Sequence, residues 1–254
     1  SVVTDKAQRG RILDRNGKTL AGPGIASSVG IVPGKLQNKE EAVKELALLL
    51  DMREETILQK LSASWVKEDS FVPLATIPKV SELELMAENP GQELLQEQQR
   101  QEQLLAVPGV MLTDQEIRTY PLGEAASHLI GYVQPVTAED REEHKGEGYD
   151  AASVIGKSGA ELLYEKELKG KNGCEIRIVD QAGNTRKVAA SVPREDGQNI
   201  QLTIDSGLQQ SLYEKFQEDP GCSVAVNPYT GEVLALVSTP SYDNNDFILG
   251  LSDT

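Results

Sequence analysis

The stretch from Arg9 to Gly17 places the strongest constraint on how this chain can fold. It reads RGRILDRNG, so three arginines bracket a single aspartate, Asp14, and the run ends in an Asn-Gly pair. Asn-Gly favours a tight hairpin because both residues tolerate the positive φ of a type I′ turn, and the implied register places Leu13 opposite Leu20. A carboxylate among guanidinium groups indicates a polar junction where several segments meet. From this stretch alone, an ordinary charged edge hairpin is the alternative.

Length and charge limit the classes of protein that the chain can represent. With 254 residues it exceeds one average domain, so we expect two or three modules. Its 25 basic and 40 acidic residues give a net charge of −15, which argues against a nucleic-acid partner. The longest apolar run, Leu46–Leu50, is far shorter than the roughly 18 residues of a membrane span. The chain opens on Ser1 without a visible signal peptide, and we expect that its natural beginning has been removed.

Cysteine and histidine show no pattern of a metal site. Cys174 and Cys222 are too few for a disulfide framework and lack ligand spacing, so we expect two small buried side chains in strands. His128 lies in an apolar run, where a structural role is favoured over that of a catalytic base. His144 lies in a loop rich in Glu, Lys and Gly and is expected to be solvated. We therefore expect no metal and no cofactor.

Helical signals dominate the region between two β-rich parts of the chain. Asn38 can cap a helix with an acidic first turn, and a second helix is expected from Arg53 to Ser62. Ser81 and Glu84 form a plausible capping box. Gln92–Gln103 is polar on all sides, which predicts either a solvated helix or a mobile segment. Residues 36–105 are therefore predicted to form a mostly helical lobe.

The last fifty residues predict a helix followed by a β-hairpin. Asp205 can cap a helix that reaches about Glu218, and its stripe of Leu208, Leu212 and Phe216 is expected to be the buried face. Ser223–Ser238 follows as a hairpin whose strands are apolar at successive positions, which is typical of strands covered on both faces.

These elements predict an α+β fold. We expect an elongated, β-rich pedestal formed by residues 1–35 and 106–204, with residues 36–105 inserted as the helical lobe.

Several stretches resemble the class B penicillin-binding proteins, the cell-wall transpeptidases, and especially their low-affinity Gram-positive branch. They are RGRILDRNG, RTYPLG followed by ASHLIGYV, GKSGAE followed by LYEKELKGKNG, NIQLTID, and AVNPYTGEVLALVSTPSYD. They occur in the family's order between Arg9 and Asp243. The resemblance implies that the first three motifs belong to a non-catalytic, dimerisation-type pedestal module. It also implies that residues 205–254 are the truncated beginning of a transpeptidase domain.

The notable residues of the three pedestal motifs are predicted to form a structural cluster. Arg9, Asp14, Arg118 and Glu161 are expected to converge into one partly buried, hydrogen-bonded group, because each is a charge in a segment otherwise rich in glycine and apolar residues. The complete predicted set is Arg9, Gly10, Asp14, Arg15, Gly17, Arg118, Tyr120, Pro121, Gly123, His128, Gly156, Gly159 and Glu161.

Transpeptidase chemistry in this family needs a nucleophilic serine in S-x-x-K, an S-x-N element and a K-[ST]-G strand. Ser64–Lys67 and Lys157–Gly159 match two of these patterns but are interpreted as structural, since the first follows a short helix and the second opens one. No serine has Asn two positions later. We therefore expect no catalytic residue in this chain and a nucleophile beyond Thr254.

The resemblance implies a parent D,D-transpeptidase at the extracellular face of the cell membrane, with an anchor segment absent from this chain. Its partners would be peptidoglycan stem peptides and β-lactams, bound through the missing catalytic domain, and proteins of wall synthesis. The alternative is a protein- or glycan-interaction scaffold without enzymatic activity, which exposed apolar positions on the lobe helices would support. A third hypothesis is an enzyme with Ser64 as nucleophile. We also expect self-association through Ser223–Ser238, or folding of that segment onto the pedestal.

Overall fold

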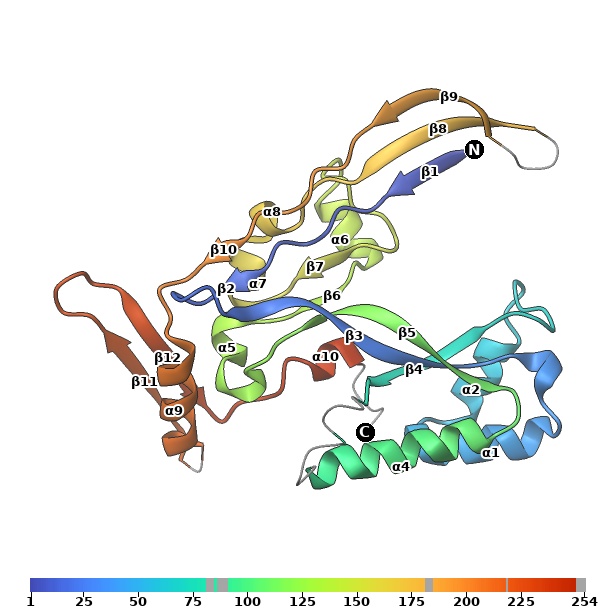
Figure 1. Ribbon diagram of the computed structural model, residues 1–254, viewed down its shortest axis with the longest axis horizontal. Helices are drawn as coiled ribbons and strands as arrows, with labels where there is room; N and C mark the ends of the chain where they lie inside the picture. Colours follow the sequence, from blue (N-terminus) through green and yellow to red (C-terminus); the bar gives the residue numbers. More distant parts are fainter. Residues whose placement is uncertain (81–84, 86–90, 181–184, 218, 250–254) are drawn as a thin grey trace. The chain divides into compact units, whose positions relative to one another are not determined.

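The computed structural model describes residues 1–80, 85, 91–180, 185–217 and 219–249 (Figure 1). The described residues form two compact units, one containing 1–23 with 118–248 and the other containing 24–117 with Leu249. The unit boundaries fall within two long strands, β3 (Thr19–Ile31) and β5 (Val110–Thr119). Sheets and helices are both present, so the predicted α+β class is confirmed.

The unit of residues 24–117 packs three helices with strands β3, β4 and β5 around an aliphatic core. Besides the two long strands, its elements are η1 (Pro33–Lys35), α1 (Lys39–Leu50), α2 (Glu54–Leu61), β4 (Val72–Pro78) and α4 (Gln92–Ala106). As predicted, Asn38 caps α1, and its side chain accepts a hydrogen bond from the amide of Glu41 at 3.3 Å. Strand β4 pairs antiparallel with β3, with Ile31 opposite Val72.

Helix α4 resolves the two alternatives for the polar segment. Gln92–Gln103 is helical, as the solvated-helix alternative predicts, and Leu104 in the last turn is fully buried in the unit's core. The predicted capping box of Ser81 and Glu84 lies outside the described residues.

The other unit contains a three-stranded antiparallel sheet in the order β1 (Val2–Asp5), β8 (Gly173–Val179), β9 (Thr185–Val192), whose strands run side by side in Figure 1. A second group of strands joins β2 (Ile12–Leu13) to the start of β3 and, in parallel, to β10 (Ile200–Gln201). Its remaining elements before residue 205 are η2 (Gly123–Ala125), α5 (Ser127–Ile130), β6 (Val133–Pro135), α6 (Ala138–Glu143), β7 (Val154–Gly156), α7 (Gly159–Leu163) and α8 (Glu165–Leu168).

The hairpin between β2 and β3 forms, but its predicted turn type and register are wrong. Among the described non-glycine residues only Asp51 has a positive φ, so Asn16 does not adopt the type I′ conformation. Gly17 alone is left-handed, with φ of 82°, and Leu13 lies opposite Thr19. The side chain of Asp14 accepts hydrogen bonds from the amides of Asn16 and Lys18, both at 2.8 Å, and so stabilises a three-residue loop with a bulge.

The C-terminal part of this unit contains α9 (Ser206–Phe216), β11 (Gly221–Val226), β12 (Val233–Thr239) and α10 (Asp246–Leu249). Asp205 caps α9 as predicted, accepting from the amide of Leu208 at 3.0 Å. The predicted buried stripe is wrong, because Leu208 is 36% exposed and Leu212 and Phe216 are only half-buried, while Gln209 is fully buried.

Gln209 is buried because its side-chain amide hydrogen-bonds to backbone groups at the edge of β12 that does not pair with β11. Its Nε2 donates to the carbonyls of Leu236 and Ala125, each at 2.7 Å, and its Oε1 accepts from the amide of Leu236 at 2.8 Å. Asp205 adds a bond from its amide to the carbonyl of Leu234 at 2.8 Å. Satisfying the backbone of a strand edge in this way outweighs the burial of one more leucine.

In strand β11, Val224 and Val226 lie exposed, so within this chain that strand is not covered on both faces. Cys222 of β11 is also exposed and Cys174 of β8 is half-buried, so the expectation of two buried cysteines is wrong. Among the described helices, none combines the length and apolar character that crossing a bilayer requires.

Candidate functional site: a buried polar network

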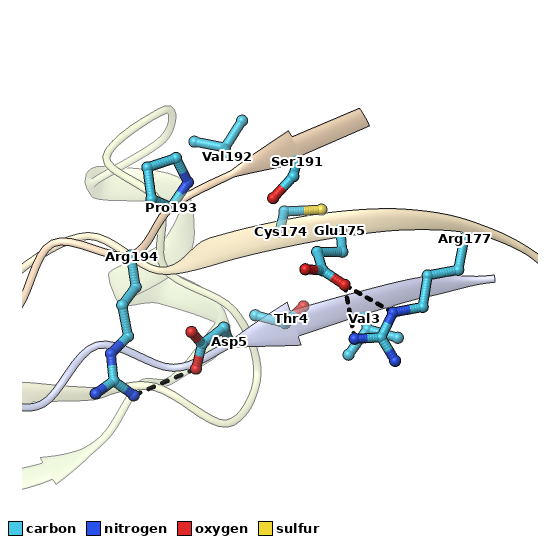
Figure 2. Close-up of a pocket in the computed structure, with 10 residues that line it drawn as sticks. All are labelled: Val3, Thr4, Asp5, Cys174, Glu175, Arg177, Ser191, Val192, Pro193 and Arg194. Atoms are coloured by element: carbon cyan, nitrogen blue, oxygen red, sulfur yellow. Dashed lines mark hydrogen bonds and ion pairs between the residues drawn. The ribbon is translucent and has the colours of Figure 1, made fainter. Parts of the chain in front are cut away.

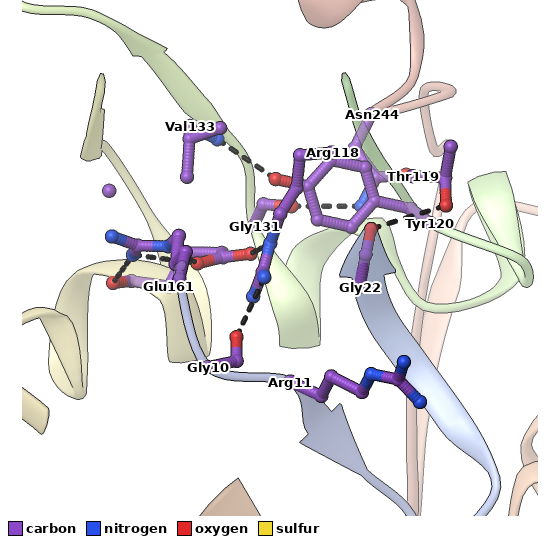
Figure 3. A network of polar contacts seen from close by, with 12 residues as sticks. Gly10, Arg11, Gly22, Arg118, Thr119, Tyr120, Gly131, Val133, Glu161 and Asn244 are labelled. Atoms are coloured by element: carbon purple, nitrogen blue, oxygen red, sulfur yellow. Dashed lines mark hydrogen bonds and ion pairs between the residues drawn. The ribbon is translucent and has the colours of Figure 1, made fainter. Parts of the chain in front are cut away.

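Glu161 is the centre of the network and reaches it from the first turn of α7. The side chain is fully buried, and its Oε1 accepts a hydrogen bond from Nε of Arg118 at 2.6 Å. Its Oε2 accepts from Nε of Arg9 at 2.9 Å. Arg118, at the end of β5, also donates from Nη1 to the carbonyl of Gly10 at 2.7 Å (Figure 3). Three segments that are distant in sequence therefore meet at one carboxylate.

A second carboxylate balances the charge of the two arginines. Nη2 of Arg9 lies 2.6 Å from Oε2 of Glu165, which also accepts from the amide of Gly156 at 3.0 Å. The hydroxyl of Tyr149 donates to the other oxygen, Oε1, at 2.7 Å. Two guanidinium groups thus face two carboxylates, and this pairing compensates much of the cost of removing four charges from water.

The pKa values of two residues in the network reflect this surrounding. Burial opposes the charge on Arg9, but the carboxylates of Glu161 and Glu165 more than offset it, so the pKa of Arg9 is raised. Burial, followed by the hydrogen bond to Glu165, raises the pKa of the Tyr149 hydroxyl. Both shifts favour the protonated forms, the charged guanidinium of Arg9 and the neutral hydroxyl of Tyr149, which donate the hydrogen bonds of the network.

Tyr120 connects the network to the segment that follows β12. It is buried, and its hydroxyl accepts a hydrogen bond from the amide of Val133 at 3.0 Å (Figure 3). Its backbone amide donates to Oδ1 of Asn245 at 2.9 Å, and its carbonyl accepts from Nδ2 of the same side chain at 3.0 Å. Burial and then the charge of Glu161 raise the pKa of the Tyr120 hydroxyl. One asparagine side chain therefore pairs with both backbone groups of Tyr120.

Asp14 does not join the cluster, contrary to the prediction that four charges converge. Among the described residues, it shares no hydrogen bond or ion pair with Arg9, Arg118 or Glu161. Its Oδ2 instead accepts from the amide of Ser206 at 3.3 Å, at the start of α9. Burial acts to raise the pKa of Asp14, but hydrogen bonds from the Ser206 hydroxyl and from backbone amides lower it overall.

Two glycines of the third motif are required by close backbone approach. A Cβ on Gly156 would lie 2.2 Å from the carbonyl oxygen of Glu161. Gly159 has a φ of 56°, and a Cβ there would lie 2.6 Å from the amide of Gly131. Any side chain at either position would displace the turn that delivers Glu161 to the network.

The other predicted site residues lie around the network rather than in it. Arg15 lies 3.7 Å from Glu232 and is partly exposed. Pro121 is exposed, and a Cβ on Gly123 would lie 3.3 Å from the side chain of Asp243. His128 is exposed, and its Nε2 lies 3.1 Å from the carbonyl oxygen of Pro240.

Sequence reasoning missed Glu165, Tyr149 and Asn245. Glu165 lies one helical turn beyond Glu161, and this spacing was an available signal. Asn245 lies two residues after the last recognised motif, but a polar turn residue carries no sign of a distant partner. The stacking of the Tyr132 and Phe247 rings, 3.9 Å between centroids, was also missed.

The two stretches that resemble catalytic motifs lack catalytic geometry. Ser64 is exposed in a turn after α2 has ended, so no helical turn brings Lys67 onto it. Lys157 pairs with Asp140 at 2.6 Å, and the Ser158 hydroxyl is buried without a hydrogen-bond partner among the described residues. Nor do the described residues contain a group of three or more His, Cys, Asp or Glu side chains placed to hold a metal ion.

A separate groove of about 530 Å³ lies on the three-stranded sheet (Figure 2). Two ion pairs line it, one joining Arg177 and Glu175 at 2.6 Å and the other joining Arg194 and Asp5 at 3.3 Å. The two pairs balance in charge, so the groove has no excess of either sign.

Comparison with protein families identifies the chain as a module of the penicillin-binding proteins. A family model described as the penicillin-binding protein dimerisation domain matches residues 4–202, and the chain belongs to this family.

Individual proteins that are similar in sequence support this family assignment. The chain is 42% identical over 253 residues to penicillin-binding protein 3 of Bacillus subtilis, covering 99% of this chain and 35% of that protein. It is 32% identical over 252 residues to peptidoglycan D,D-transpeptidase MrdA of Escherichia coli, covering 96% and 37%. The chain thus spans about a third of the length of these curated relatives.

The fold is also similar to that of a solved structure, the complex between penicillin-binding protein PBP2 and MreC from Helicobacter pylori. The TM-score is 0.65 at 24% identity, over 100% of this chain and 45% of that one. At this identity the likeness shows the fold alone.

Proposed function

We propose that the chain is the non-catalytic portion of a peptidoglycan D,D-transpeptidase that acts in cell-wall biosynthesis outside the cell membrane. Residues 1–35 and 106–204 would form the pedestal, 36–105 an inserted lobe, and 205–254 the beginning of the transpeptidase domain. The name of the Escherichia coli relative supports this activity for the parent protein. Stem peptides and β-lactams would bind through the domain that follows.

One observation carries this proposal: polar contacts tie the first elements after residue 204 directly to the family motifs. Asp14 accepts from the amide of Ser206, and Asn245 pairs with both backbone groups of Tyr120. A support that must hold a catalytic domain in one orientation needs such contacts, since buried polar groups that lose their partners are costly. The network would thus fix where transpeptidase chemistry is presented.

Labelling with a fluorescent penicillin tests the activity. We expect the parent protein, extended beyond Thr254, to be labelled at the serine of an S-x-x-K motif, and the 254-residue chain to stay unlabelled. A Ser64→Ala variant of the parent should be labelled as fast as the unmodified protein. Labelling of the short chain that disappears with Ser64→Ala would overturn the proposal in favour of an enzyme within these residues.

A scaffold role is the second candidate, and the lobe helices favour it. Leu48 on α1 is 85% exposed, and Leu58 on α2 and Leu95 and Leu105 on α4 are also exposed. The related PBP2 of Helicobacter pylori forms a complex with MreC, which supports a wall-synthesis protein as the partner. Replacing Leu48 and Leu105 by Ser should abolish partner binding while penicillin labelling of the parent persists. Partner binding that survives this change would count against the lobe as the docking surface.

Self-association through the C-terminal hairpin remains a proposal, with β11 as the available edge. The edge of β12 is bonded by Asp205 and Gln209, whereas β11 pairs only with β12 among the described strands. Light scattering should show dimers that a Val224→Lys change dissociates, because a lysine on an edge strand opposes further pairing. A strict monomer at all concentrations would refute this.

A further inference from the structure

Strands β1, β8 and β9 concentrate exposed aliphatic side chains. They hold seven of the 21 large hydrophobic side chains that lie exposed among the described residues: Val2, Val3, Ile176, Ile178, Val179, Val188 and Val192. Exposed apolar residues are ordinary when scattered, but a contiguous group marks a contact surface. A three-stranded sheet with so much uncovered aliphatic surface is suited to bind a partner.

The strand register assigns these side chains to two different faces. Val2, Ile176 and Ala190 are opposite one another, as are Thr4, Cys174 and Val192, and Ile178 is opposite Lys187. Since directly paired residues share a face, these eight form one face, called here the aliphatic face. Its four large aliphatic side chains are 67% (Val2), 47% (Ile176), 53% (Ile178) and 62% (Val192) exposed. The other face carries Glu175, Arg177 and Ser191, and these line the groove together with Thr4, Cys174 and Val192 of the aliphatic face (Figure 2).

The edge of β9 has features that oppose pairing with another strand. Its pairing with β8 is interrupted by two register shifts, and Arg186 and Lys187 lie between its ends. Bulges and cations are devices by which proteins prevent edge-to-edge pairing. A binding partner is therefore expected to lie across the aliphatic face rather than extend the sheet.

Charge selects among the occupants of this face. Among the eight residues of the aliphatic face, only Lys187 is charged. Lys187 forms no ion pair with another described residue. The three strands carry three basic and two acidic residues within a chain of net charge −15. So acidic a chain is repelled by an anionic bilayer. The face also lacks the aromatic side chains typical of membrane interfaces.

We propose that the aliphatic face binds an amphipathic helix of another protein, with an aliphatic stripe across Val2, Ile176 and Val192 and a carboxylate on Lys187. A helix suits the face because its backbone groups are already paired and it needs no free sheet edge. This inference rests on the scaffold role proposed above and adds to the lobe helices a second surface with its own partner chemistry.

A pair of synthetic peptides tests this with the full 254-residue chain. Each peptide is an amphipathic helix of about 16 residues, long enough at ~1.5 Å per residue to follow a seven-residue strand. One carries Glu and its twin carries Lys beside the leucine stripe. We expect the Glu peptide to bind more tightly by fluorescence anisotropy, and Ile176→Ser to weaken it by at least about tenfold. Val188→Ser, on the opposite face of β9, is the matched control and should leave binding unchanged.

A charge exchange at Lys187 supplies the sharper readout. With Lys187→Glu the Lys peptide should bind more tightly than the Glu peptide. Non-specific hydrophobic binding would not show this reversal of affinity. Equal binding of both peptides, absence of binding, or an equal effect of Val188→Ser would overturn the proposal. So would Ile176-dependent binding to phosphatidylglycerol vesicles, which indicates lipid, or an Ile176-dependent dimer in light scattering, which indicates a second copy. Each of these failures leaves penicillin labelling of the parent unaffected, so they are distinguishable from failure of the proposed transpeptidase activity.

Discussion

Replacing Glu161 by glutamine should destabilise the unit that contains the network more than any surface charge change. Glu161→Gln keeps the shape of the side chain but removes the charge that faces both Arg9 and Arg118. Arg9 retains Glu165 at 2.6 Å, whereas Arg118 keeps only the carbonyl of Gly10 at 2.7 Å. The change thus leaves one guanidinium, 6% exposed, without a carboxylate.

Breaking a buried ion pair in this way costs about 3–5 kcal/mol. At about 2–4 °C per kcal/mol for a domain of this size, Tm should fall by roughly 6–20 °C. Differential scanning calorimetry measures the shift. The matched control is Asp114→Asn, which breaks the exposed pair of Asp114 with Lys79, at 2.6 Å, and should cost at most about 1 kcal/mol. If Glu161→Gln melts within about 1 °C of the parent, the network does not stabilise the fold as argued.

Three further changes give separate tests of stability. Asp14 has a lowered pKa, so the stability from its carboxylate is present above the unfolded-state pKa of about 4 and is lost as pH falls through the lower folded pKa. Asp14→Asn should therefore destabilise at pH 7, and its difference from the parent in denaturant titrations should shrink below about pH 4. Gln209→Ala leaves two backbone groups of Leu236 unpaired, so we expect a loss of about 2–4 kcal/mol and faster amide exchange at that residue. Gly159→Ala should cost at least about 2 kcal/mol in thermal melts, against about 1 for Gly146→Ala, where φ is also positive but the space is open.

The sequence predicted correctly those features that depend only on neighbouring residues, such as helix caps. Asn38 and Asp205 cap helices as expected, since a cap depends on residues within one turn. The charges in the three motifs predicted that Arg9, Asp14, Arg118 and Glu161 converge, and all but Asp14 meet in the structure. Their meeting follows from the pattern of charges in glycine-rich segments.

The misplaced features depend on contacts that the sequence does not display. Leu208 was expected inside, but α9 faces an open strand edge, and only a polar amide such as that of Gln209 satisfies it. Asp14 was expected beside arginines, but neighbouring amides of its own turn are closer and hold it there. Asn245 carries no pattern at all, because its partner lies 125 residues away.

The division of the chain also sets an order for folding. Residues 24–117 are one continuous stretch, so that unit can form as soon as they have been synthesised. The other unit cannot close until Glu161 emerges, 152 residues after Arg9. Once that unit has folded, it shortens the effective loop between Arg9 and Glu161, and the entropy lost on closing that loop falls accordingly. The unit of residues 24–117 is thus expected to act as a kinetic aid, and a core substitution that delays its folding should slow closure of the network.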